Sequence, residues 1–447
     1  MGQLTLPDEG YSKDSARSGK QREEEARELK GAPRVKTVNR RQVQLRPCDL
    51  EGLVASDHRA RLVWGLVERL DLSGFYAQIN ARGSEPGRPA IDPKILVTLW
   101  LYATMQGLGN ARELARQCEE HDAYRWICGG VRVNHHTLSD FRVEHESALD
   151  ELFTQVLGVL LHQRAVELRR VSHDGMRVRA SAGKSSFRRR KSLERCLHKA
   201  REQVQAVKQS AANAQGSGDK RRQEAAARAA REREQRVQRA LEELKKVEAA
   251  KAATKDKKRS SEARASTTDA QAHVMRMADG GFRPAYNAQF ATDTSSGVIV
   301  GVGVNMGNDG GQVEPMLAEI ERRTGRRPEQ YLVDGGFVKA ESLEHAAAQG
   351  VQVYAPVPEA RKGSDRYAPR PADTPAVSQW RERMATDEAT AIYKERAASA
   401  ELSNADLRQW RGLDKLVVRG VRKVQCVTLW AALAHNLLRW LTLGVST

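Results

Sequence analysis

The chain has 447 residues, and 74 Lys and Arg outnumber 57 Asp and Glu, for a formal net charge of +17. This length exceeds that of one ordinary domain, so we expect two or three. A basic excess of this size favours a polyanionic partner, with nucleic acid ahead of an anionic membrane surface.

The sequence disfavours membrane-spanning and disulfide-stapled proteins. No window reaches the roughly 18–20 apolar residues of a membrane span, and the best candidate, 427–443, is interrupted by His435, Asn436 and Arg439. The five cysteines include no Cys-x-x-Cys pair, so neither a disulfide framework nor a zinc site is expected. No apolar run opens the chain, and we expect a cytoplasmic protein without a membrane partner.

A charged tail is expected to precede a helical domain. Residues 1–45 are charged and poor in aromatic side chains, which predicts disorder. From residue 46 to about residue 165, apolar side chains recur at helical spacing, as at Val63, Leu66 and Val67. We therefore predict an N-terminal all-α domain over 46–165.

The remainder of the chain predicts a mixed α/β sheet. Alternating apolar residues predict a first strand at 168–181, and the later segments follow as strand, strand, helix, strand, helix, strand and helix. These segments are 285–293, 297–306, 311–324, 330–337, 340–350, 351–358 and 387–410, with a Pro-rich loop at 359–385. Such alternation is typical of a mixed sheet with helices on its faces. We assign 166–183 and 266–420 to this domain, and 421–447 to a C-terminal helix that packs on it.

One long segment, 184–265, interrupts the α/β order. Its apolar residues Leu193, Leu197, Ala200 and Val204 step by four and three, which predicts a coiled-coil seam. The simplest structure is an inserted helical hairpin with two antiparallel arms of roughly 25–30 residues. The segment holds 25 Lys and Arg against 11 Asp and Glu, so +14 of the chain's net charge of +17 lies here. We expect the hairpin to contact nucleic-acid backbone or to pair two protomers.

Three acidic residues occupy positions that suit metal chemistry. Asp174 lies in the first strand, Asp334 ends a later strand, and Glu401 lies on the helix at 387–410. Open α/β sheets place ligand sites at strand ends, and carboxylates that meet there suit Mg²⁺, which prefers oxygen ligands. Two such ions about 4 Å apart can clamp the attacking and leaving oxygens of a phosphoryl transfer. An acid in such a position, taken alone, is more often a residue of a turn or of a solvent-exposed helix face. The spacing of the three acids along the sequence does not show that they lie together in the fold.

Several sequence blocks, taken in order, resemble the DDE-type transposases of bacterial insertion sequences. Residues 88–130, followed by His-His-Thr-Leu-Ser-Asp-Phe-Arg, resemble the N-terminal domain of that family. The blocks that resemble its catalytic region are 173–183, 281–293, 331–337, 393–401 and 419–437. The resemblance spans about residues 85–447. It implies a ribonuclease-H-like catalytic fold in which Asp174, Asp334 and Glu401 hold two Mg²⁺ ions, with Mn²⁺ as an alternative metal.

The family's late signature is Tyr-x2-Arg-x3-Glu-x6-Lys. Tyr393 and Arg396 match it, whereas Glu401 follows Arg396 after four intervening residues instead of three. The last position is Arg408 in place of Lys. Glu401 and Arg408 are seven residues apart, so they share a helix face. The resemblance implies that Tyr393, Arg396 and Arg408 contact DNA beside the metal site.

Other residues stay open as alternatives for these roles. Glu395 is the alternative to Glu401. Asp293, at the end of a predicted strand, and Asp309, in the Asn-Asp-Gly-Gly stretch 308–311, compete with the other two acids. His173 precedes Asp174, but side chains alternate along a strand, so it is expected to point away from the site.

The resemblance implies DNA transposition by metal-dependent hydrolysis at the element's terminal inverted repeats, followed by strand transfer. The expected partners are double-stranded DNA, as element ends and target, and a second protomer that forms a homodimer on paired ends. Helices near 108–145 would bind the repeats, with Arg112, Arg116 and Arg142 contacting phosphates. Two alternatives remain: a catalytically inactive or repurposed DNA-binding protein, and a metal-dependent nuclease that acts on another substrate.

Overall fold

The computed structural model describes residue 41 and residues 49–83, 89–212, 217–252, 263–359 and 365–443. The predicted tail, 1–45, thus lies outside the described residues except at residue 41. The residues from Asp49 onward form one compact unit. No helix within the described ranges is long and apolar enough to cross a membrane.

The N-terminal part of this unit, called the helical half below, is helical up to His162, as the sequence predicts. Its elements are η1 (Glu51–Leu53), α2 (Arg59–Val67), α3 (Ser73–Tyr76), α4 (Pro93–Met105), α5 (Ala111–Glu120), α6 (Asp122–Cys128), α7 (His135–Glu144) and α8 (Glu146–His162). Side chains of Asp92, Asn110 and Asn134 cap α4, α5 and α7 by accepting hydrogen bonds from first-turn backbone N–H groups. Helix α4 is buried almost throughout, because the other helices surround it.

The second half contains a six-stranded mixed sheet. Its strands are β1 (Arg170–Arg179), β4 (His273–Arg276), β5 (Phe282–Asp293), β6 (Ile299–Asn305), β7 (Gln330–Val333) and β8 (Gln352–Tyr354). The order is β4-β5-β1-β7-β8, with β6 also paired to β5. Strand β1 is antiparallel to β5 and parallel to β7, and β7 is parallel to β8. The mixed α/β class predicted from the sequence is therefore confirmed, with β4 as a strand that the sequence did not predict.

Helices cover this sheet, and one of them corrects the sequence prediction. They are α11 (Val313–Thr324), α12 (Ala340–Ala348), α13 (Pro375–Met384), α14 (Asp387–Arg396), α15 (Leu402–Trp410) and α16 (Val421–Thr442), and the short turn η4 (Gly335–Phe337) follows β7. Between α14 and α15 lies η5 (Ala397–Glu401), a π-helical turn. Helix α13 lies inside the predicted loop at 359–385. Pro375 is its first residue, a position where proline's missing N–H costs nothing.

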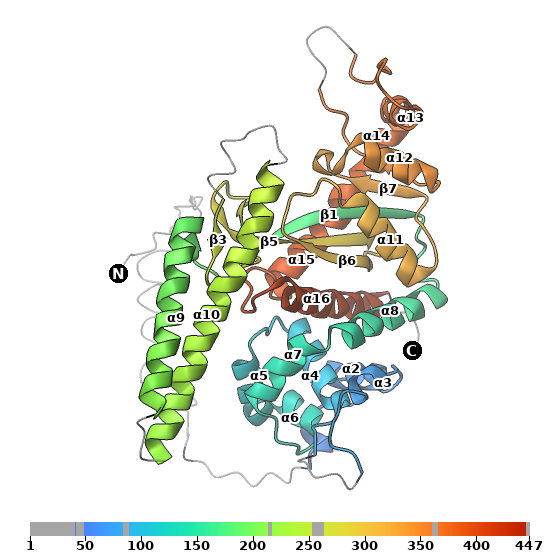
Figure 1. Ribbon diagram of the computed structural model, residues 1–447. Coiled ribbons are helices and arrows are strands. Elements are labelled where there is room, and N and C mark those ends of the chain that lie inside the picture. Colours follow the sequence, from blue (N-terminus) through green and yellow to red (C-terminus); the bar gives the residue numbers. More distant parts are fainter. Residues whose placement is uncertain are drawn as a thin grey trace, which may run out of the picture. The chain divides into compact units, whose positions relative to one another are not determined.

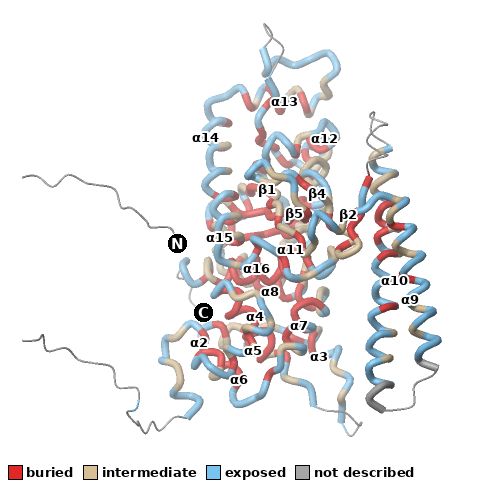
Figure 2. The backbone as a smooth tube through the Cα atoms, turned by 90° about the vertical axis from the view of Figure 1, so that its left-hand side faces the viewer, coloured by how far each residue is buried: buried red, intermediate tan, exposed pale blue. Residues whose placement is uncertain are grey.

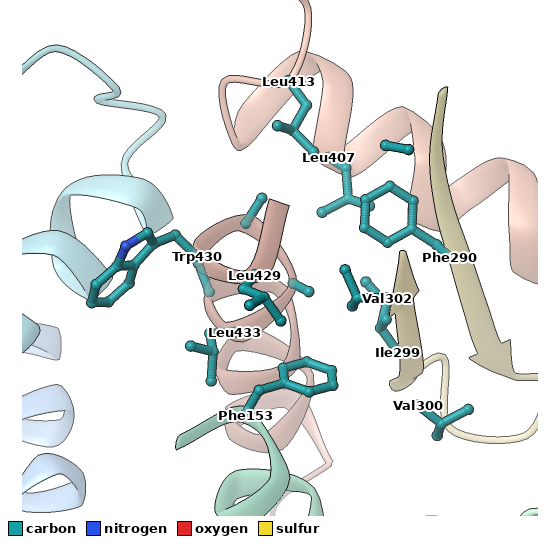
Figure 3. Packing of buried hydrophobic residues seen from close by; sticks show 14 of the residues in the cluster. Phe153, Phe290, Ile299, Val300, Val302, Leu407, Leu413, Leu429, Trp430 and Leu433 are labelled. Carbon is teal, nitrogen blue, oxygen red and sulfur yellow. The ribbon is translucent and has the colours of Figure 1, made fainter. Parts of the chain in front are cut away.

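Helix α16 joins the helical half to the sheet. It packs against β6 on one side and against α4, α7 and α8 on the other, as Figure 1 shows. Trp430 and Leu433 of α16 lie in the same apolar core as Phe153 of α8 and Ile299 of β6 (Figure 3). The Asn436 side chain accepts from Ile299 N and donates to Ile299 O, both at 2.8 Å, which pairs backbone groups at the edge of β6.

The basic insertion contains two long antiparallel helices, α9 (Arg190–Ala212) and α10 (Ser217–Ala252). They enclose an apolar cluster of their own, centred on Leu193, Val237, Ala240 and Leu244, whereas most other positions of both helices are exposed (Figure 2). Ion pairs cross between the arms, such as that of Arg201 with Glu234 at 3.3 Å. The apolar seam is thus short, and the remaining surface carries the charge.

Candidate active site

The register of two parallel strands brings Asp174 and Asp334 to neighbouring positions. Strand β1 pairs with β7 so that His173 lies opposite Val333, and each acid is the next residue along its own strand. Neighbouring strands lie about 4.8 Å apart, and residues aligned across a sheet point to the same face. The register therefore supports a shared site for the two carboxylates.

Asp174 is enclosed by polar groups from the late helix. Its Oδ1 lies 3.2 Å from Arg396 Nη2, and its Oδ2 accepts a hydrogen bond of 3.0 Å from Asn404 Nδ2. Burial raises the pKa of the Asp174 carboxyl, the guanidinium of Arg396 opposes this rise, and the charges of Asp309 and Asp334 add to it. Like-charged carboxylates thus act on one another here, as in sites that bind cations.

The π-helical turn η5 accounts for the position of Glu401. In an α-helix a residue four positions later returns to the same face, but in a π-helix, whose hydrogen bonds join residues i and i+5, the fifth does so. Glu401 is the fifth residue after Arg396, and η5 spans this interval. The extra residue relative to the signature is therefore absorbed within one turn, and Glu401 stays on the face of Arg396.

The structure does not bring all three predicted acids together. Glu401 is exposed, and it is an i, i+3 neighbour of Asn404, which contacts Asp174. Within the described residues, no three His, Cys, Asp or Glu side chains lie close enough to hold one metal ion between them. The assembled part of the predicted triad is the pair Asp174 and Asp334.

Comparison with family models identifies two parts of the chain. The model described as "Transposase domain (DUF772)" matches residues 48–144, and the model described as "Transposase DDE domain" matches residues 361–441. The chain is a DDE transposase. No curated protein and no solved structure was found to match it. The fold described above is consistent with the ribonuclease-H-like architecture of such enzymes, which typically use divalent metal ions.

The second match contains Tyr393, Arg396, Glu401 and Arg408, whereas Asp174 and Asp334 lie between the two matched segments. The roles of these acids in the transposase therefore rest on geometry. Tyr393 is half-buried, and burial raises the pKa of its hydroxyl. Its charge environment includes Arg396, Asp334 and Asp174, so the late helix, the middle of β1 and the end of β7 meet at this point.

Two of the alternative acids have structural roles in the transposase. Asp293 is buried, and its Oδ2 accepts hydrogen bonds from the hydroxyls of Ser295 and Ser296 at 2.7 Å each, while its Oδ1 accepts from Leu168 N. It fixes the turn after β5. Glu395 forms an ion pair with Arg170 at the start of β1. The third alternative, Asp309, lies beside β1 at Gly175.

His173 is a core residue of the transposase sheet. Its ring is fully buried against Phe337, and its Nδ1 lies 2.7 Å from the Tyr331 hydroxyl. Burial lowers the pKa of His173 to about 3, so the imidazole is neutral at working pH. This position agrees with the expectation from strand alternation.

The N-terminal arginines differ in their access to solvent. Arg112 is exposed, and Arg116 is exposed but paired with Glu113 at 2.6 Å. Arg142 is only 6% exposed; it lies over the Trp100 ring and donates a hydrogen bond to Gly109 O. Burial lowers the pKa of Arg142 to about 10. The expected phosphate contact of Arg142 is therefore not supported, because its guanidinium holds α7 against the loop before α5.

Sequence reasoning missed the amide partner of Asp174. Asn404 lies three residues after Glu401. Its role as a hydrogen-bond donor to Asp174 becomes visible only where α15 contacts β1. Its Oδ1 is buried and has no hydrogen-bond partner within the described part of the chain, as is true of Arg396 Nε. Unpaired polar atoms beside a carboxylate are typical of a site that receives a ligand.

Deleting Ala397 tests the interpretation of η5. The deletion restores the three-residue spacing, so we expect a regular α-helix in which Glu401 keeps its face. The melting temperature should be unchanged or higher, and DNA cleavage should stay within about tenfold of the parent, because Glu401 keeps its position relative to Arg396. Thermal melting and a cleavage assay measure the two effects.

Deleting Ala405 is the matched control. It removes one alanine from α15, where no π-helical turn can absorb the change, and rotates Asp406 away from His435 and Arg411, with which it pairs at 2.8 Å. We expect a loss of stability in this variant. If both deletions abolished cleavage equally, η5 would not be the element that compensates for the extra residue.

Proposed function

We propose that this DDE transposase cleaves DNA at the terminal inverted repeats of its element and transfers the freed strand to a target. The observation that carries the proposal is the neighbouring position of Asp174, on β1, and Asp334, directly after β7, beside the late helix of the matched DDE domain. The ribonuclease-H-like assignment of 166–183 and 266–420 belongs to the same proposal. We place the reaction in the bacterial cytoplasm, where the DNA lies.

The donor set fits a hard divalent cation. Carboxylate and amide oxygens are the ligands that Mg²⁺ prefers, and the site offers Asp174, Asp334 and the unpaired Oδ1 of Asn404. Asp174, Asp334 and Glu401 would hold two Mg²⁺ ions, or Mn²⁺. When bound, such ions activate the attacking hydroxyl group and neutralise the charge that develops on the phosphate.

Arg396 and Tyr393 have a positioning role in this proposal. Arg396 neutralises Asp174 at 3.2 Å in the DNA-free chain, and Asp174 is enclosed enough for this pairing to matter. The guanidinium then turns to a DNA phosphate once the carboxylate binds a cation, since planar bidentate binding of phosphate suits arginine. Tyr393, one turn earlier on α14, would position the flanking DNA.

A pocket rich in arginine would hold a DNA strand. It is lined by Arg408 of α15, by Arg177 and Arg179 of β1, and by Arg283 of β5, together with Asp279 and Asp414. Arg179 pairs with Asp414, and Arg283 pairs with Asp279 at 2.6 Å. Arg408 forms no hydrogen bond or ion pair with the described residues. Its charge is therefore free for a phosphate, two helical turns after Glu401.

Replacing Arg408 with Ala should weaken DNA binding and lower the slope of log K against log salt by about one unit, since one phosphate contact is lost. Fluorescence anisotropy at several salt concentrations measures both effects. The matched control is Arg422→Ala, which removes an exposed arginine paired with Glu146 at 2.8 Å and should leave the slope unchanged. Equal slopes for the Arg408→Ala variant and the parent would exclude Arg408 from the phosphate contacts.

End recognition is assigned to the helical half. The exposed side chains of Arg112 and Arg116 on α5 would contact phosphates of the terminal repeat, which position the protein without reading the sequence. Two ends must be brought together for strand transfer, so we propose a homodimer on DNA. The basic helices α9 and α10 would add backbone contacts or pair the protomers.

The experiment that tests the function is Mg²⁺-dependent cleavage of DNA that carries the element's own ends. We expect cleavage at the ends with Mg²⁺, and none with chelator or with scrambled repeats of equal length. Cleavage that ignores the repeat sequence would point to a nuclease with another substrate. Binding to the repeats without any cleavage would point to a DNA-binding protein that has lost catalysis.

A further inference from the structure

A further carboxylate lies against the strand that carries Asp174. Asp309 precedes α11, and its Oδ1 packs directly on β1 at Gly175. A Cβ atom at position 175 would lie 2.1 Å from Asp309 Oδ1, so any side chain there would displace the carboxylate. The glycine that follows Asp174 thus makes room for Asp309.

Two buried amides hold this carboxylate. Asn287 Nδ2 and Gln289 Nε2 of β5 donate hydrogen bonds of 2.7 and 3.0 Å to Asp309 Oδ1. Both side chains are almost completely buried, at 0% and 1% exposed. Arg177 Nη2 lies 3.9 Å from the other oxygen, Oδ2, at the open side. Asp309 is therefore held in place by hydrogen bonds at one oxygen, while its other oxygen faces a cation.

The amides leave their own oxygens unpaired. Asn287 Oδ1 and Gln289 Oε1 are buried and have no hydrogen-bond partner among the described residues. An unsatisfied buried acceptor costs about 1–3 kcal/mol, and buried polar groups are usually paired. Both amides therefore direct their N–H groups at Asp309 at the expense of their oxygens. Such an arrangement is expected where the charge of the carboxylate has a use.

The charge of Asp309 reaches the catalytic pair. Asp309 Oδ1 packs against Gly175, the residue after Asp174, and the pairing of β1 with β7 places Asp334 beside Asp174. Like charges that are neighbours destabilise one another until a cation enters. Asp309 lies on the side of β1 that Gly175 leaves open, so it acts on the cation through its field.

We propose that Asp309 is a positioning residue of the active site, whose negative charge, held by Asn287 and Gln289 against Gly175, strengthens the binding of divalent cations at Asp174 and Asp334. The inference rests on the proposed function, because it requires a cation at these two acids. It adds a fourth carboxylate to the three of the DDE set.

The test is Mn²⁺ binding to the full chain without DNA, measured by calorimetry or by the electron paramagnetic resonance signal of free Mn²⁺. Asp309→Asn keeps the shape and one acceptor but removes the charge, and we expect about tenfold weaker binding. Asp309→Glu restores the charge and should recover most of the affinity. The control Glu314→Gln removes an exposed acid from the first turn of α11 and should have no effect.

The outcomes separate this inference from the proposed function. If the parent chain bound no Mn²⁺, or if Asp334→Asn bound it equally well, the metal site itself would be wrong. If Asp334→Asn lost binding while Asp309→Asn matched the parent, only the role of Asp309 would be overturned. Equal weakening in Asp309→Asn and Asp309→Glu would also overturn it, because the shape of the side chain and not its charge would then matter.

Discussion

Asp334→Asn should lower the rate of DNA cleavage by at least about 10³-fold, which corresponds to about 4 kcal/mol of lost transition-state stabilisation. The substitution keeps the size of the side chain and its acceptor for Gly335 N, which Asp334 Oδ1 contacts at 2.6 Å. It removes the negative charge that would bind a cation beside Asp174, and carboxylate charge dominates the affinity of hard cations. The fold should therefore persist while catalysis is lost.

Single-turnover cleavage of end-containing DNA measures this effect, and thermal melting confirms that the variant folds. Asp365→Asn is the matched control, since Asp365 is exposed in the segment before α13 and its carboxylate accepts from Tyr367 N at 2.9 Å. Its cleavage rate should equal that of the parent. Undiminished cleavage by Asp334→Asn would show that Asp334 is not part of the site. The assignment of Asp174 would then lose the support of a neighbouring carboxylate.

The sequence could predict that Asp174 and Asp334 end or interrupt strands, because apolar runs and Asp-Gly turns are local signals. It could not predict that the two strands are neighbours. Their pairing joins residues about 160 positions apart, across the long helices α9 and α10, and only the register of β1 with β7 aligns the acids. Local periodicity contains no information on such a pairing.

Other features could not be predicted from the sequence, for different physical reasons. The alanine-rich stretch before Glu401 has strong helix propensity, so nothing local distinguishes the π-helical turn η5 from an α-helix. Asn287 and Gln289 are of residue types that are mostly exposed, but β5 is covered on both faces and buries them. Arg142 looked like a surface cation because charge composition does not report burial.

A second prediction concerns the contact between the helical half and the sheet domain. Arg323 of α11 has a fully buried side chain, which pairs with Asp150 of α8 and with Glu319. Its Nη1 also donates to Thr154 Oγ1 at 2.8 Å, and the guanidinium lies over the Phe153 ring. Arg323→Leu should lower the free energy of unfolding by about 3 kcal/mol, because it removes the buried cation from the partly buried Asp150 and Glu319 and leaves them only the exposed Arg322.

Arg322→Leu is the control for this prediction, since Arg322 contacts the same two acids at 2.9 and 3.0 Å but its side chain is 51% exposed. Exposed pairs contribute about 0–1 kcal/mol because water and salt screen them. Urea unfolding followed by circular dichroism should therefore separate the two variants by about 2 kcal/mol or more. Equal midpoints would mean that apolar packing of α8 on α11 and α16 holds the two halves together. The buried guanidinium would then fix how the helices align without adding stability.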